Sequence, residues 1–204
     1  MSDRRPTRAW QRMLSGRRLD LIDPSPLDVE ISDIAHGLAR VARWNGQTKG
    51  PEIFSVGQHS LLVEALFAAC ADEPPTGSAR LAALLHDAPE YVIGDMISPF
   101  KASIGGEYRK VEGRLQRAIH IRFGLPAEPP PDLVKRIKAA DRISAFLEAR
   151  ALAGFGEAEA RRLFGAPTMP LEAFASFLEP LRPAEVEARF LARFAELDGA
   201  AASA

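Results

Sequence analysis

The chain has 204 residues, 47% of them hydrophobic, which is enough to bury one complete core. Its formal net charge is −1, and acidic and basic residues are well mixed, so nucleic acid is not expected as a partner. A single cysteine, Cys70, excludes an intramolecular disulfide framework and fits a reducing compartment. Neither a secretory signal nor a membrane-length apolar run is visible. We therefore expect a cytoplasmic protein with no membrane partner.

The first part of the chain predicts a small hairpin or an extended arm. Residues 17–31 alternate in short pieces around Pro24 and Pro26, which is typical of such segments. Apolar residues at helical spacing follow and predict a helix that ends near residues 44–46. These residues are Ile34, Ala35, Leu38, Val41 and Ala42.

A second helix is expected to begin at Ser55. Ser55 followed by Gln58 resembles a capping box, which places His59 in the first turn of this helix. Its expected buried face consists of Leu61, Leu62, Ala65, Leu66 and Ala69.

The next helix is expected to carry an adjacent His86 and Asp87. A turn at residues 74–77 precedes it. Pro89 cannot lie deep within a regular helix, because it lacks an N–H donor and clashes with the preceding turn. His86 and Asp87 are therefore predicted at a helix end or kink.

The rest of the chain also reads as helical. An amphipathic pattern from Tyr108 to Phe123 stops at Gly124, and a proline-rich link precedes a long helix from about Asp132 to Ala153. One or two further helices and an Ala-rich tail follow. This pattern predicts an all-α, single-domain helical bundle.

Asp141 lies in the middle of the apolar stripe of that long helix, where an unpaired carboxylate would be costly. A salt bridge or a helix cap is the ordinary explanation, and His59 alone is more often a core histidine. Taken together, however, His59, His86, Asp87 and Asp141 are interpreted as the ligands of one divalent metal ion. Imidazole and carboxylate ligands suit Mn, Co, Fe or Zn better than Ca, and Mg is a further option.

The order His59, His86–Asp87, Asp141 resembles the H…HD…D signature of the HD superfamily of metal-dependent phosphohydrolases. The segment HDAPEYVIGDMISPFK, followed by EYRKVE, is similar to the subgroup of the bacterial 5'-deoxynucleotidases. The resemblance covers about residues 33–154. It implies an HD-type fold, one catalytic divalent ion, a nucleoside 5'-monophosphate as small-molecule substrate, and a homodimer. The expected organisation is an arm or hairpin (1–30), an HD phosphohydrolase domain (31–197) and a flexible tail (198–204).

The resemblance also implies roles for individual residues. Glu90 matches the acid/base glutamate and Asp95 a second catalytic carboxylate. Substrate contacts are implied for Arg43, Trp44, Ser98 and Lys101. Without the resemblance, Glu90 could be only a helix cap, Trp44 a core aromatic, and Arg43, Ser98 and Lys101 ordinary surface residues.

Other functions remain open at this stage. The link between Trp44 and His59 is longer than in the deoxynucleotidases, and Gln58 stands where that subgroup tends to have Glu. A triphosphohydrolase that releases tripolyphosphate from a dNTP is therefore an alternative. An alternative of another class is a non-catalytic, metal-stabilised nucleotide-binding or regulatory module, although Glu90 and Asp95 favour an enzyme.

Overall fold

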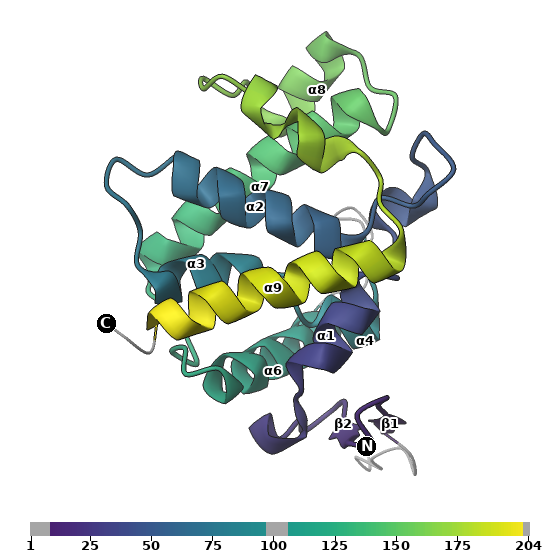
Figure 1. Cartoon of the computed structure of the whole chain (residues 1–204), viewed down its shortest axis with the longest axis vertical. Coiled ribbons are helices and arrows are strands. Elements are labelled where there is room, and N and C mark those ends of the chain that lie inside the picture. Colours follow the sequence, from purple (N-terminus) through teal and green to yellow (C-terminus); the bar gives the residue numbers. More distant parts are fainter. Residues whose placement is uncertain (1–8, 97–105, 202–204) are drawn as a thin grey trace.

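The computed structural model describes residues 9–96 and 106–201, and most of them are helical (Figure 1). The α-helices are α1 (Ile31–Leu38), α2 (Val56–Ala69), α3 (Gly77–Leu84), α4 (Glu90–Ile93), α6 (Gly106–Arg122), α7 (Pro131–Ala151), α8 (Glu157–Phe164) and α9 (Pro183–Ala201). The described residues also form the short 3-10 helices η1 (Pro26–Asp28), η2 (Arg43–Gly46) and η3 (Glu172–Leu178). The predicted all-α fold class is confirmed. Among the described residues, no helix is both long and apolar enough to cross a membrane.

A two-stranded antiparallel hairpin precedes the helices. Its second strand lies within residues 17–31, whose alternation predicted a hairpin or an arm, and its first strand lies before them. β1 (Trp10–Arg12) pairs with β2 (Arg18–Asp20). The turn between them uses Gly16 at φ +88°, a backbone conformation that glycine adopts at little cost. Ser15 fastens the hairpin to α1, because its N–H and its Oγ–H donate to the carboxylate of Asp33 at 3.0 and 2.5 Å.

Helix α2 is the centre of the bundle and packs against α3, α7 and α9 (Figure 1). The predicted N-cap is confirmed, since Ser55 Oγ accepts the N–H of Gln58 at 3.3 Å. The reciprocal half of the capping box is absent from the described contacts. The Gln58 amide instead bonds to the backbone of Glu179 (2.8 Å) and Leu181 (2.9 Å), so it fixes the segment before α9 to the start of α2.

A buried ion cluster joins the same helices at a second place. Glu64 of α2 is 2% exposed and accepts hydrogen bonds from Arg80 of α3 at 2.6 Å and from Arg193 of α9 at 2.9 Å. Two guanidinium groups thus satisfy one buried carboxylate, which would otherwise be costly inside the core.

Helix α1 ends at Leu38, earlier than the expected end near residues 44–46. The apolar spacing continues to Ala42, but there the backbone is extended and forms a bridge with Ser55. The N–H of Arg43 donates to Phe54 O at 2.8 Å, so the chain exchanges helical hydrogen bonds for bonds across the bridge. The chain then enters η2 with Trp44 and Asn45 in the left-handed region, at φ 57° and 50°.

The short helix α4 lies directly against α1. A Cβ atom on Gly37 of α1 would lie 2.8 Å from Cβ of Tyr91, which is closer than side chains approach. Glycine at this position therefore allows α4, which begins with Glu90, to lie against α1.

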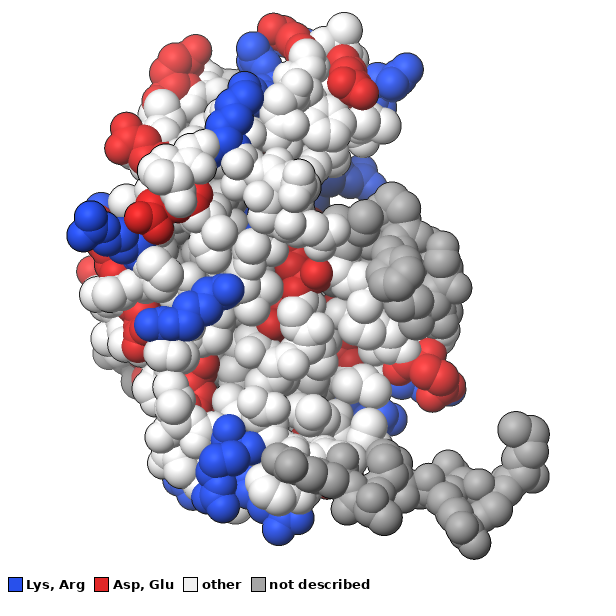
Figure 2. Space-filling model, turned by 90° about the vertical axis from the view of Figure 1, so that its right-hand side faces the viewer, with Lys and Arg blue, Asp and Glu red and all other residues white. Residues whose placement is uncertain are grey.

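The C-terminal helix α9 continues to Ala201, past Asp198, where the expected tail begins. Its end packs on the start of α3, since a Cβ on Gly77 would lie 3.0 Å from Ala201 N. This packing explains why the Ala-rich sequence stays helical to that point. Figure 2 shows acidic and basic side chains interspersed over one face, in keeping with the formal net charge of −1.

Candidate metal centre

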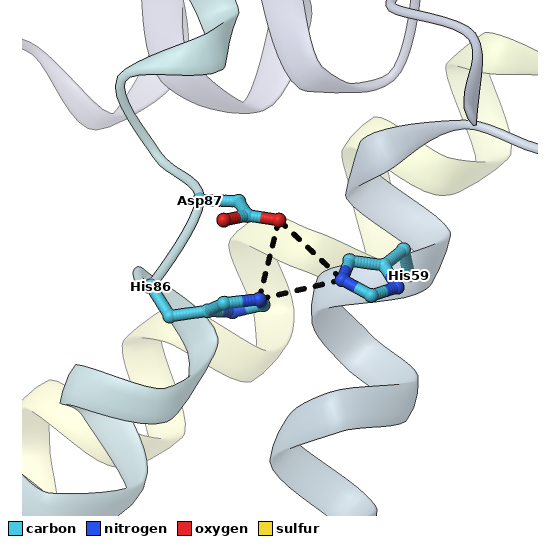
Figure 3. A group of neighbouring side chains, drawn as sticks. All are labelled: His59, His86 and Asp87. Atoms are coloured by element: carbon cyan, nitrogen blue, oxygen red, sulfur yellow. Dashed lines mark hydrogen bonds and ion pairs between the residues drawn. The ribbon is translucent and has the colours of Figure 1, made fainter. Parts of the chain in front are cut away.

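Three side chains from two segments converge beside the N-terminal end of α2 (Figure 3). His59 lies in the first turn of α2, and His86 and Asp87 lie in the turn after α3, as the position of Pro89 predicted. The two Nε2 atoms are 3.3 Å apart, and Asp87 Oδ2 lies 3.4 Å from His59 Nε2 and 3.3 Å from His86 Nε2. His59, His86 and Asp87 thus form a possible metal site.

Hydrogen bonds at the far side of each ring determine which nitrogen faces the site. His59 Nδ1 lies 2.6 Å from Glu148 Oε1, and His86 Nδ1 lies 2.9 Å from the carbonyl of Ala83. Both oxygens can only accept, so each Nδ1 carries the proton and donates it. In neutral rings both Nε2 atoms then present lone pairs to one point, an arrangement that a cation stabilises.

Asp141 of α7 adds a second carboxylate, and its Oδ1 lies 3.3 Å from His59 Nε2. For ligands about 2.1 Å from an ion, neighbouring ligand atoms are about 3.0 Å apart in an octahedron and about 3.4 Å apart in a tetrahedron. The separations of 3.3 and 3.4 Å measured here lie in this range. The residues present therefore fit one divalent ion.

Four carboxylates surround the single guanidinium of Arg43. Glu148 Oε2 lies 3.4 Å from its Nε and Asp95 Oδ2 lies 3.3 Å from its Nη1, while Asp87 and Asp141 act on it through their charge. Burial alone would lower the pKa of Arg43, but these carboxylates outweigh it and raise the pKa. The surplus of negative charge favours a bound cation.

The same charges act on the ligands themselves. Burial and the charge of Arg43 would lower the pKa of His59, yet Glu148, Asp141 and Asp87 raise it well above its ordinary value. Burial would raise the pKa of Asp87, but the two histidines hold it well below the usual range. The cluster thus favours positive charge at His59 and ionised carboxylates around it.

Glu148 was not predicted from the sequence as part of the site. Its carboxyl is fully buried, and although burial would raise its pKa, the charges of Arg43 and His59 lower it to about 2. A signal was present, because Ser144 and Glu148 follow Asp141 at helical spacing on the same face of α7. A glutamate on the buried face of α7 would be costly without a partner, which is the argument that identified Asp141.

Of the residues expected to contact substrate, Arg43 lies at the metal cluster, whereas the ring of Trp44 packs against other aromatic side chains. Arg43 and Asp95 lie together beside the metal cluster. The indole of Trp44 packs against Phe155 and Phe164, with ring centroids at 5.6 and 5.8 Å. Its Nε1–H donates to Glu148 at 2.8 Å, so the indole is already engaged by other side chains of the protein. Its contact with a sugar or base stays a prediction.

Glu90, the predicted acid/base residue, is buried next to the turn that carries Asp87. Glu90 is the first residue of α4 and is 1% exposed, and its N–H donates to Asp87 O at 3.0 Å. Its role as acid or base stays a prediction. Ser98 and Lys101 lie outside the described residues.

Comparison with known proteins agrees with this geometry. The model of the HD domain matches residues 56–145, a range that contains all four expected metal ligands. The chain is 61% identical over 188 residues to an uncharacterized protein of Rhodobacter capsulatus, covering 91% of this chain and 94% of that protein. The chain belongs to the same family as that protein and carries an HD domain. HD domains bind divalent metal ions, and this domain points to the superfamily of metal-dependent phosphohydrolases.

Proposed function

We propose that the protein is a metal-dependent phosphohydrolase that removes phosphate from nucleoside 5'-monophosphates, with deoxyribonucleotides as the preferred substrates. The observation that carries the proposal is the position of Arg43. Its buried guanidinium pairs with Asp95 and interacts with the charges of Asp87 and Asp141, two of the proposed metal ligands. A phosphate bound between Arg43 and the metal ion would therefore contact a cation on each side.

In this proposal His59, His86, Asp87 and Asp141 hold one divalent ion. The ion, when bound, acts as a Lewis acid that makes a water more nucleophilic and offsets the charge of the phosphate. Arg43 orients the phosphate, and its five N–H donors exceed the two that Glu148 and Asp95 engage among the described residues. The resemblance assigns the proton transfers to Glu90 and Asp95.

Product analysis tests this function directly. Purified protein is incubated with dNMPs, NMPs and dNTPs in the presence of Mn²⁺, Co²⁺ or Mg²⁺, and with chelator as the blank. We expect orthophosphate from the dNMPs. Tripolyphosphate from dNTPs would instead assign the triphosphohydrolase function, and the absence of any product would favour the binding module.

A pair of variants separates metal binding from turnover. Asp141→Asn removes a ligand charge, so we expect loss of both bound metal and activity. Glu90→Gln keeps all four ligands, so we expect near-normal metal content with a rate reduced about 100-fold or more, the usual contribution of general acid–base catalysis. The measurements are the metal content of each variant by elemental analysis and its kcat. A near wild-type rate for Glu90→Gln would refute the role of Glu90 as acid or base.

A further inference from the structure

One carboxylate connects the metal cluster with the Arg43–Trp44 corner. Oε1 of Glu148 accepts from His59 Nδ1 at 2.6 Å and from Ser144 Oγ at 2.7 Å. Oε2 accepts from Trp44 Nε1 at 2.8 Å and from Arg43 Nε at 3.4 Å. Each oxygen therefore serves a different part of the site.

The bond to Oε1 prepares His59 as a ligand. With its Nδ1–H held by a carboxylate, the ring is fixed in one orientation and in the tautomer that leaves Nε2 free to coordinate. The negative charge behind the ring also makes Nε2 more basic. Ser144, one turn before Glu148 on α7, holds Oε1 in place.

The bonds to Oε2 hold the corner. Trp44 has φ 57°, a conformation that is unfavourable for a bulky residue and persists only where its surroundings hold it. The indole N–H bond to Glu148 and the ring contacts with Phe155 and Phe164 supply that support. Arg43, the preceding residue, contacts the same oxygen and reaches Asp95.

We propose that Glu148 is a positioning residue that couples the metal ligand His59 to the Arg43–Trp44 corner. Hydrogen bonds that share an acceptor group in a buried, low-dielectric environment polarise one another. A cation at His59 Nε2 strengthens its Nδ1–H as a donor, draws the charge of Glu148 toward Oε1, and weakens Oε2 as the acceptor for Trp44. The proposal rests on the metal site of the proposed function, but it requires no particular substrate.

Metal affinity of the apo-protein gives the first test, with Zn²⁺ as the probe in a competition titration. Glu148→Gln keeps the shape of the side chain and removes its charge, and we expect about 10–100-fold weaker binding, as for other partners of metal-ligating histidines. Glu64→Gln is the matched control. It also removes the charge of a buried carboxylate held by arginines, but that carboxylate accepts hydrogen bonds from Arg80 and Arg193, and the described contacts include none between it and a metal ligand. We expect its Zn²⁺ affinity to stay within about twofold of wild type, because no ligand hydrogen bond is lost.

The second test begins with the wild-type protein, whose two tryptophans provide a probe and a control. In a ¹⁵N spectrum the indole N–H signal of Trp44 should shift as Zn²⁺ is added, while that of Trp10, in the hairpin strand β1, should stay in place. In Glu148→Gln at saturating Zn²⁺ the Trp44 shift should be lost or greatly reduced.

The outcomes distinguish the two proposals. Wild-type protein that binds Zn²⁺ without a change at Trp44 overturns the coupling and leaves the metal site intact, as does equal loss of affinity in Glu148→Gln and Glu64→Gln. Wild-type protein that binds no Zn²⁺ overturns the metal site and the coupling together. A shift at Trp44 with selective loss of affinity in Glu148→Gln supports both.

Discussion

At the scale of single residues, two buried serines have opposite hydrogen-bond environments. Ser144 Oγ on α7 donates to Glu148 at 2.7 Å. Ser60 Oγ on α2 is equally buried and has no hydrogen-bond partner among the described residues. A hydroxyl bonded to a carboxylate contributes to stability, whereas a buried hydroxyl without a partner carries a desolvation cost.

These environments predict opposite effects of the same substitution. Ser144→Ala should lower the free energy of unfolding by about 1.5–3 kcal/mol, the range for hydrogen bonds to charged groups. Ser60→Ala should leave it unchanged or raise it. Urea denaturation of the two variants beside wild type makes the comparison, and equal destabilisation of both would contradict this account.

At the scale of helices, the close approach of α1 and α4 depends on Gly37. A methyl group there would lie 2.8 Å from both Cβ and O of Tyr91, and the second of these is backbone that cannot rotate away. Because Glu90 precedes Tyr91, a shift of α4 displaces the proposed acid/base residue as well. Packing of the two helices and placement of the site are therefore linked at this contact.

Gly37→Ala should cost about 1–3 kcal/mol of stability, the usual range for overpacking. It should also reduce kcat more than it weakens metal binding, because the ligands lie on α2, α7 and the turn after α3. Gly113→Ala is a suitable control, since a Cβ there meets nothing within 4 Å and the helix gains a better helix former. A Gly37→Ala protein with normal stability would show that α4 tolerates the displacement.

At the scale of the whole molecule, the ligand set exists only in the folded state. His59, His86 and Asp141 come from segments far apart in the chain, and the packing of α2 against α3 and α7 brings them together. An ion that binds only the folded protein stabilises it by mass action, by about 2.7 kcal/mol at a concentration of 100 times its Kd.

Saturating metal should therefore raise Tm by roughly 5–10 °C for a chain of this size. Thermal unfolding followed by circular dichroism, with Mn²⁺ and then with excess chelator, measures the shift. Asp87→Asn should abolish most of it, whereas Glu64→Gln, although less stable, should retain it. A shift of the same size in Asp87→Asn would place the stabilising ion elsewhere.

Local signals allowed much of this structure to be predicted from sequence. The Ser55 cap located the start of α2 and the position of His59, and Pro89 located the helix end that carries His86 and Asp87. Spacing and motif brought His59, His86, Asp87 and Asp141 into one group. The structure places the first three together, and Asp141 Oδ1 lies 3.3 Å from His59 Nε2.

Features that depend on distant contacts were not predictable in this way. The end of α1 at Leu38 is set by pairing with residues near Ser55, and apolar spacing carries no information about such a bridge. The role of Gln58 depends on backbone groups of the C-terminal segment. The spacing from Asp141 could have drawn attention to Glu148, but its contacts with Trp44 and Arg43, about a hundred residues earlier in the chain, could not be predicted.

The left-handed backbone at Trp44 and Asn45 has a consequence for protein engineering. Asn45→Gly relieves an unfavourable conformation, and a designer who seeks heat resistance would choose it early. Yet the same constraint points the preceding indole at Glu148, and a glycine beside it allows the corner to sample other shapes. A variant selected for durability at this position would thus be expected to catalyse less well, and a screen that scores only survival on heating would not detect the loss.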